Sequence, residues 1–253
     1  MCGHKQQLNA SGAKIRVKGP VSVALEKGGV GVLSFPSTPD EREVPDANIF
    51  KRARMEQPFA RSLRARSEIE RRQALLGLPH MLELTRYRAR LIEEGFGEIP
   101  HFDPLDGGTA AKILFLFEKP GPKTSLHGGG SGFISRDNDD ATAEATFNFM
   151  KLATIPREDS IIWNVVPGWN GTIRLAREEK ARGKVALTAL LDLLPAVRTV
   201  VLVGRQASTV AAPLADRGLK VVTSFHPSPK VRAISPDKWK SIPVAWKDAV
   251  SVG

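Results

Sequence analysis

From residue 111 onward, short apolar runs alternate with longer amphipathic stretches along this 253-residue chain. The apolar runs are rich in Ile, Val, Leu and Phe and nearly continuous, as expected for parallel strands that are buried on both faces. They predict four strands, over residues 112–117, 160–164, 199–204 and 220–225. Strands that alternate with helices through right-handed crossovers form layered α/β folds. The predicted fold is therefore a three-layer α/β/α sandwich with a central four-stranded parallel sheet.

The stretches between these runs carry apolar residues at intervals of three and four, which is the spacing of one helix face. They predict helices over residues 141–153, 173–194, 206–215 and 236–250. Asp139 or Asp140 can cap the first of these helices, since both precede it directly. Upstream of the sheet, a further apolar stripe predicts a helix that packs into the core: Met81, Leu84, Tyr87 and Leu91.

The chain before this region divides into two predicted segments. Residues 1–55 alternate Gly, Pro, Ser and charged residues with short apolar patches, which predicts a flexible or weakly structured extension. Residues 56–110 are predicted as a basic helical segment, and residues 111–253 as the α/β domain. Between Lys51 and Arg72, eight Lys and Arg minus three acidic residues leave +5. We interpret this run as a solvated helix face, with a surface that tracks phosphates as the alternative.

Charge and cysteine content narrow the possible partners and cofactors. The net charge of +10, from 37 Lys and Arg against 27 Asp and Glu, favours a polyanionic partner. The single cysteine, Cys2, excludes an internal disulfide and any multi-cysteine zinc or iron–sulfur site. We therefore expect a cytoplasmic monomer without metal or cofactor. No apolar stretch is long enough to span a bilayer, so no membrane partner is expected.

Polar residues gather where the predicted strands end, and parallel sheets bind ligands at that edge. His226 follows the last strand and opens the turn Pro227-Ser228-Pro229, which two prolines stiffen. A rigid loop can hold an imidazole where charge develops on a leaving group. Glu118 follows the first strand, and Asn164 ends the second. These strand ends predict one active site.

Three features of this edge have two interpretations each. Asn164 can read the amide-like edge of a pyrimidine, or it can tie down the turn before Pro167. Phe133, which directly follows the glycine-rich residues 128–132, can stack on a flat base or anchor the core. The glycine-rich loop can present its N–H groups to a ligand, or it can serve as a mobile lid.

In their order and spacing, four motifs resemble those of the uracil-DNA glycosylase superfamily, over about residues 111–247. The motifs are Glu118-Lys119-Pro120-Gly121, Gly132-Phe133, Asn164 and His226-Pro227-Ser228-Pro229. The resemblance implies a four-stranded parallel sheet with helices on both sides. It also implies an enzyme that flips a damaged base out of DNA and hydrolyses its N-glycosidic bond.

The resemblance further implies roles for individual residues. Phe133 would stack on the flipped base, and Asn164 would hydrogen-bond its Watson–Crick face. His226 would stabilise negative charge on O2 of the departing uracil, while Pro120 and Gly121 would shape the first loop. Downstream of the histidine, three residues are candidate DNA contacts: Ser228, Lys230 and Arg232.

The sequence also departs from the family pattern. Lys119 stands where the best-known branch has a water-activating Asp, and Phe117 stands where most branches have Gly. Glu118 resembles the acid of the branch that reads Gly-Glu-Ala-Pro-Gly, but the four cluster-binding cysteines of that branch are missing. Lys230-Val231 replaces the intercalating Leu. We therefore assign water activation to Glu118 or to an acid of residues 137–140.

The leading hypothesis is a DNA-repair glycosylase that removes uracil or a related deaminated base. The first alternative is a catalytically weak or inactive nucleic-acid-binding module on the same scaffold, which Lys119 suggests. A second is a different α/β enzyme that acts on free nucleotides or nucleosides.

Overall fold

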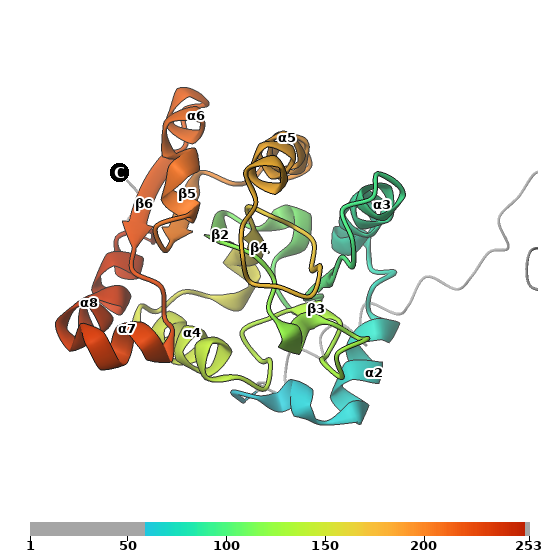
Figure 1. The fold of residues 1–253 in the computed structure, drawn as a ribbon, viewed down its shortest axis with the longest axis horizontal. Coiled ribbons are helices and arrows are strands. Elements are labelled where there is room, and N and C mark those ends of the chain that lie inside the picture. Colours follow the sequence, from blue (N-terminus) through green and yellow to red (C-terminus); the bar gives the residue numbers. More distant parts are fainter. Residues whose placement is uncertain (1–58, 251–253) are drawn as a thin grey trace, which may run out of the picture. The chain divides into compact units, whose positions relative to one another are not determined.

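The computed structural model describes residues 59–250, so the expected extension over residues 1–55 lies outside the described part. Within it, the main sheet has four parallel strands in the order β4-β2-β5-β6 (Figure 1). They are β2 (Ile113–Phe117), β4 (Ser160–Asn164), β5 (Thr199–Val203) and β6 (Lys220–Ser224). Each bound agrees with the predicted one to within one residue. The predicted α/β fold with a parallel sheet is confirmed.

Helices cover both faces of this sheet (Figure 1). One layer contains α4 (Ala141–Leu152) and α8 (Pro236–Lys247), whose Trp246 ring packs edge-on against Phe115 of β2 at 5.0 Å between centroids. The other contains α5 (Arg177–Asp192) and α6 (Ala211–Asp216), with α3 (Pro79–Glu93) beside α5. The Tyr87 hydroxyl of α3 donates to the Ala186 carbonyl of α5 at 2.9 Å. These contacts complete the predicted three layers.

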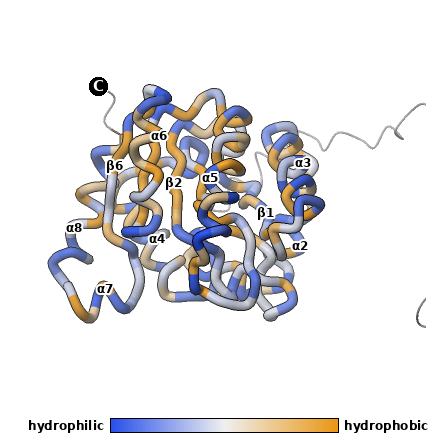
Figure 2. Tube along the Cα trace, turned by 45° about the horizontal axis from the view of Figure 1, so that its top comes forward, coloured by the Kyte–Doolittle hydropathy of each residue, from blue (hydrophilic) through white to orange (hydrophobic). Residues whose placement is uncertain are grey.

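The strands differ in exposure according to their place in the sheet. β2 and β5 lie in the middle, and β5 is buried at all five residues. β6 lies at the edge and is partly exposed throughout. Its residues are accordingly of mixed hydropathy, whereas those of the central strand β2 are apolar (Figure 2). The segment that carries His226 therefore leaves the sheet at its rim.

The helical segments depart from the predicted bounds where local geometry intervenes. In the predicted helical segment, the basic stretch becomes α-helical only at α2 (Arg66–Ala74), because Arg61 is left-handed at φ 63° and starts a short 3₁₀ turn. Residues 206–215 divide into a 3₁₀ turn and α6, and α7 (Pro229–Ile234) was not predicted. The 3₁₀ turns are Ser62–Arg64, Gly108–Ala110, Pro122–Thr124, Arg157–Asp159 and Ala207–Val210. The apolar stripe of α3 is buried as predicted.

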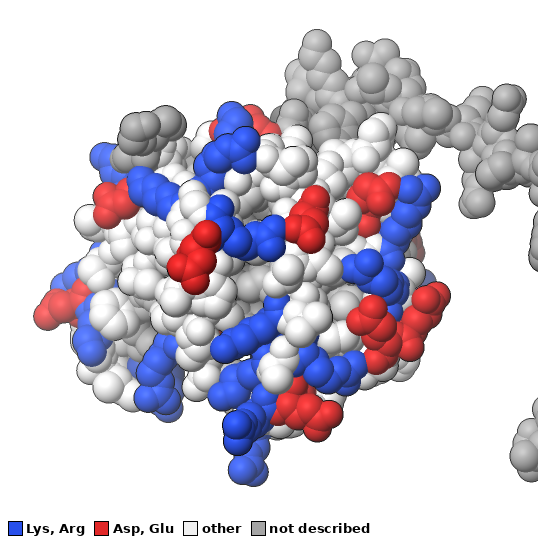
Figure 3. Space-filling model, turned by 90° about the horizontal axis from the view of Figure 1, so that it is seen from above, with Lys and Arg blue, Asp and Glu red and all other residues white. Residues whose placement is uncertain are grey.

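Much of the basic stretch is paired with carboxylates. Arg61 binds Glu144 at 2.9 Å, and Arg66 and Arg71 pair within α2 with acids one turn away. Arg72 is completely buried, so the solvated-face interpretation is wrong for this residue. On the face seen in Figure 3, Lys and Arg lie in several groups with Asp and Glu between them. The positive charge there is not gathered into one tract.

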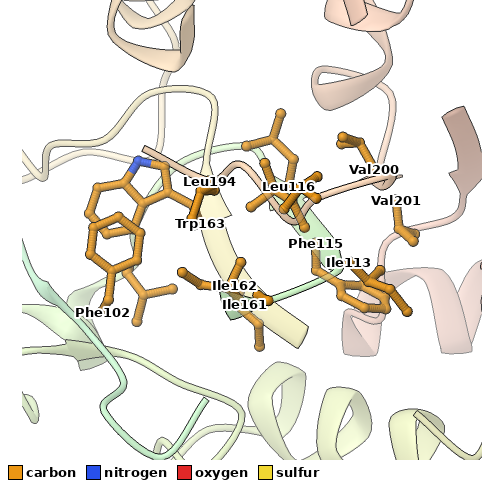
Figure 4. Packing of buried hydrophobic residues seen from close by; sticks show 14 of the residues in the cluster. Phe102, Ile113, Phe115, Leu116, Ile161, Ile162, Trp163, Leu194, Val200 and Val201 are labelled. Carbon is orange, nitrogen blue, oxygen red and sulfur yellow. The ribbon is translucent and has the colours of Figure 1, made fainter. Parts of the chain in front are cut away.

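The core lies between the sheet and its two helical layers (Figure 4). Its centre includes Trp163 of β4, which stacks on Phe102 with ring centroids 3.7 Å apart. Phe102 belongs to β1 (His101–Phe102), which pairs in parallel with β3 (Phe133–Ile134) in a separate two-stranded sheet. The sequence did not predict this pair, which places residues 133–140 beside the main sheet's edge.

Six charged side chains form a network next to this small sheet, all buried except Arg157, which is 16% exposed: Arg72, Asp103, Asp106, Arg136, Asp137 and Arg157. Arg72 contacts Asp103 and lies 2.6 Å from Asp137 Oδ2. Arg157 reaches the same two carboxylates at 2.6 and 2.8 Å. Burial alone would raise the pKa of Asp103, but Arg72 and Arg157 lower it to about 2. The ion pairs of these three arginines and three aspartates join four separate parts of the chain, at residues 72, 103–106, 136–137 and 157.

We expect Arg72→Met to lower the free energy of unfolding by about 3–5 kcal/mol, because it leaves the buried carboxylates of Asp103 and Asp137 undercompensated. Urea denaturation measures the change. The control is Arg66→Met, which removes an ion pair whose Arg is 91% exposed and should cost at most about 1 kcal/mol. Equal losses in the two variants would contradict a structural role for the network.

The network also predicts a pH dependence of stability. Burial raises the pKa of Asp106 to about 6, although Arg136 and Arg157 oppose the shift. The folded protein therefore holds this proton more tightly than the unfolded chain, whose Asp pKa is about 3.9. The contribution of this group to the free energy of unfolding is fully present below about pH 4 and is lost as the pH rises through about 6.

Asp106→Asn keeps an uncharged side chain at every pH. We expect its melting temperature, relative to that of the wild type, to rise between pH 4 and pH 7. Thermal melts in a series of buffers measure this difference. A difference that stays constant over this range would show that Asp106 does not titrate there.

Candidate active site

The loops after β2, β4 and β6 meet at one cavity of about 420 Å³. Among the residues that the sequence singled out, its lining includes Glu118, Lys119, Pro120, Gly121, Asn164 and His226. Phe117 and Asn164 are paired neighbours on adjacent strands, so the first two loops leave the sheet together. Strand topology thus brings together side chains that are up to 108 residues apart (226 minus 118).

His226 is held by its ring contacts and by its own loop. Its ring packs edge-on against Phe117, with centroids 5.6 Å apart. The Ser228 N–H donates to the His226 carbonyl at 2.8 Å, and the Ser228 hydroxyl caps α7. Burial lowers the pKa of the imidazole below its ordinary value, and Glu118 and Asp140 offset only part of this effect. At neutral pH the ring is therefore uncharged, with one donor and one acceptor nitrogen.

Glu118 lies beside this imidazole because Gly204 has no side chain. Glu118 Oε1 accepts the Gln206 N–H at 3.1 Å. A Cβ on Gly204 would lie 2.8 Å from Glu118 Oε1 and 3.3 Å from His226 Cβ, and the φ of Gly204 is 93°. Glycine is thus required twice at the end of β5, by its backbone conformation and by this close approach.

Asn164 has an unpartnered carboxamide. The residue is 4% exposed, and its side chain makes no hydrogen bond with any residue between 59 and 250. Buried polar groups are nearly always paired, so a free donor and acceptor at a cavity wall mark a place for a ligand. The following turn is tied down by the backbone N–H groups of Val165 and Val166 instead. The structural interpretation of Asn164 therefore has no supporting contact.

Phe133 does not line the cavity, contrary to the stacking role that the resemblance implied. Its side chain is completely buried in β3 and packs against His101, with ring centroids 5.6 Å apart. Successive side chains of a strand point to opposite faces, and the next residue, Ile134, lines the cavity instead. The core-anchor interpretation of Phe133 is the one that fits.

Lys119 has a structural environment. Its Nζ donates to Glu179 Oε1 at 2.7 Å, to Asn170 Oδ1 at 2.8 Å and to the Arg174 carbonyl at 3.3 Å. Burial alone would raise the pKa of Glu179, but hydrogen bonds from Lys119 and the Ala176 N–H lower it overall. The ammonium group thus joins the loop after β2 to the segment before α5.

The glycine-rich loop is fastened by Glu98. This carboxylate accepts the Ser125 hydroxyl and the Leu126 N–H, both at 2.6 Å. The N–H groups of Gly128 and Gly130 donate to Ser125. These groups are used within the protein, so they do not form a cradle for a ligand.

The remaining candidates lie outside the cavity. Ser228 caps α7, while Lys230 and Arg232 are exposed on that helix. Residues that sequence reasoning did not single out complete the wall, among them Ile134, Ser135, Asn138 and Ile162. None of them carries a motif signal, because their place depends on β3 and on the pairing of β4. Asp140, expected as a helix cap and as one of the acids of residues 137–140 that could activate water, also reaches the wall.

No group of three or more His, Cys, Asp or Glu side chains within residues 59–250 could hold a metal ion. None of the helices described there is long and apolar enough to cross a membrane.

Comparison with known proteins adds little. No protein-family model and no curated protein matches the chain. One matching solved structure is that of a Methanosarcina acetivorans protein provisionally described as a uracil DNA glycosylase, determined by solution NMR. It has a TM-score of 0.38 and 14% sequence identity, over 56% of this chain and 93% of that chain. The functional assignment rests on the residues of the site.

We expect Lys119→Asp, which introduces the residue of the best-known glycosylase branch, to destabilise the fold without accelerating any base release. It removes three hydrogen bonds and places a carboxylate near Glu179, so the free energy of unfolding should fall by about 2 kcal/mol or more. Urea denaturation measures this, with the exposed Lys184→Asp as the matched control. Unchanged stability together with faster base release would contradict the structural role.

Proposed function

We propose that this protein excises uracil or a related deaminated base from DNA by hydrolysing its N-glycosidic bond. The observation that carries the proposal is that the unpartnered Asn164 carboxamide and the neutral His226 imidazole line the same cavity at the carboxyl edge of the sheet. The cavity volume lies within the range of small-molecule sites. The motif resemblance points to the same chemistry.

In this proposal, Asn164 recognises the flipped base. Its amide offers one acceptor and two donor hydrogens, which complement the alternating carbonyl and N–H groups along the edge of a uracil. Phe117, Ile134 and Ile162 line the same cavity with apolar surface. Reaching this cavity requires the base to leave the helix stack, which costs least at a mispaired or damaged position.

His226 acts on the departing base. As the C1′–N1 bond breaks, its electron pair moves onto the base, and negative charge grows on O2. A neutral imidazole N–H stabilises this anion more than it stabilises the intact nucleotide, and such differential binding accelerates the step. Water supplies the oxygen that bonds to C1′ and gives up a proton to a carboxylate. Glu118 stands beside the imidazole in this arrangement.

The rim residues would bind the phosphate backbone. Ser228, Lys230 and Arg232 follow His226 directly, where a DNA strand would pass if its base entered the cavity. Binding through these residues should weaken as salt rises, because neutralised phosphates release counterions. The inactive-module alternative drew on Lys119, whose hydrogen bonds give it a structural explanation.

The test is an oligonucleotide assay with uracil, hypoxanthine or xanthine at one position, in single and double strands, followed by alkaline cleavage of abasic sites. We expect the wild type to release at least one of these bases and His226→Gln to do so at least about 100-fold more slowly. His127→Gln is the matched control, since the His127 side chain is 90% exposed and outside the cavity.

Absence of base release from every substrate by the wild type would overturn the proposal. Equal rates for His226→Gln and the wild type would remove the imidazole from the mechanism. Hydrolysis of free deoxyuridine, without preference for the base in DNA, would favour the nucleoside-enzyme alternative.

A further inference from the structure

Two carboxylates line the cavity, those of Glu118 and Asp140. Hydrolysis needs one of them to take a proton from water, on the face of the sugar opposite the leaving base. The side of the site that holds the leaving base is marked by His226. Both carboxylates raise the pKa of this imidazole, Glu118 more than Asp140.

Glu118 lies on the side of the leaving base. The Cβ position of Gly204 would be 2.8 Å from its Oε1 and 3.4 Å from His226 Cδ2, so the carboxylate and the imidazole adjoin. Oε1 also accepts the Gln206 N–H, while Oε2 accepts no hydrogen bond from residues 59–250, so position and not pairing distinguishes Glu118. A water bound here would sit next to the departing base. This position suits a group that fixes the imidazole rather than one that delivers the nucleophile.

The other acids near the cavity are committed elsewhere. Asp137 lies between Arg72 and Arg157 in the buried network, and Asp139 is paired with Arg61. Glu98 holds the glycine-rich loop through Ser125 and Leu126. None of these three lines the cavity.

Asp140 combines a fixed position with a free oxygen. Its Oδ1 accepts the N–H groups of Thr142 and Ala143 at 2.8 and 2.9 Å, as the cap of the 12-residue helix α4. Its Oδ2 accepts no hydrogen bond from residues 59–250. Asp140 stands at the N-terminus of α4, whereas His226 follows β6, and it raises the pKa of His226 less than Glu118 does. In the same cavity, the buried Asn164 carboxamide is also unpartnered.

We propose that Asp140, and not Glu118, binds and deprotonates the hydrolytic water; this rests on the proposed function. Oδ2 takes one water proton while the water oxygen bonds to C1′. The C1′–N1 electron pair leaves with the base as an anion that His226 stabilises, and the base then gains a proton from solvent. Glu118 is a positioning residue for His226.

The chain provides conservative variants for the test. Asn caps helices about as well as Asp, so Asp140→Asn keeps the Oδ1 bonds of α4 and removes only the carboxylate. Asp140→Ser, which also caps, is the second variant. Asp139→Asn is the neighbouring control. Glu118→Gln keeps an acceptor for the Gln206 N–H.

Single-turnover base release is measured with each protein across pH, together with DNA binding and thermal melting. We expect Asp140→Asn and Asp140→Ser to release base at least about 100-fold more slowly, with binding and melting near those of the wild type. Asp139→Asn should match the wild type. Because Glu118, and to a smaller extent Asp140, raises the pKa of His226, Glu118→Gln should move the acid limb of the pH profile to lower pH, and the Asp140 variants should move it less.

The outcomes separate the two proposals. An inactive wild type would overturn both. An active wild type with fully active Asp140→Asn or Asp140→Ser would overturn only the role of Asp140. Loss of base release at every pH in Glu118→Gln, but not in the Asp140 variants, would also overturn only the role of Asp140.

Discussion

The position of the cavity wall depends on the pairing of buried aspartates with buried arginines. Asp103 and Asp137 are each shared by Arg72 and Arg157, which come from α2 and from the 3₁₀ turn before β4. Ser135 donates to Asp103 and also lines the cavity, so the network and the wall are in direct contact. Because an uncompensated buried charge is costly, these segments hold one another in place. A helix outside the sheet thereby becomes part of the support of the site.

The sequence predicted the sheet well and the small strands not at all. Strands buried on both faces leave nearly continuous apolar runs, and their carboxyl ends converge by topology. Hence Glu118, Asn164 and His226 could be placed together without coordinates. β3 is two residues long and has no period, so nothing in the sequence told which face Phe133 occupies. Its burial follows from pairing with β1, about thirty residues upstream.

Charged residues were predicted least well, because their environment comes from distant parts of the chain. Arg72 stands in a run of basic residues that has the composition of an exposed helix, yet its partners lie 31 and 65 residues further on. Lys119 occupies a motif position, yet its ammonium group points to residues before and within α5. Residue type and spacing specify a motif, but the direction of a long side chain is decided by the acids that tertiary packing brings near it.

The tether between Glu98 and the glycine-rich loop has a thermodynamic consequence. A loop with this many glycines has high conformational entropy when free, and closing it over a substrate would subtract from the affinity. Here the Ser125 hydroxyl and the Leu126 amide bind the carboxylate in the folded protein. The ordering cost of these residues is therefore met during folding.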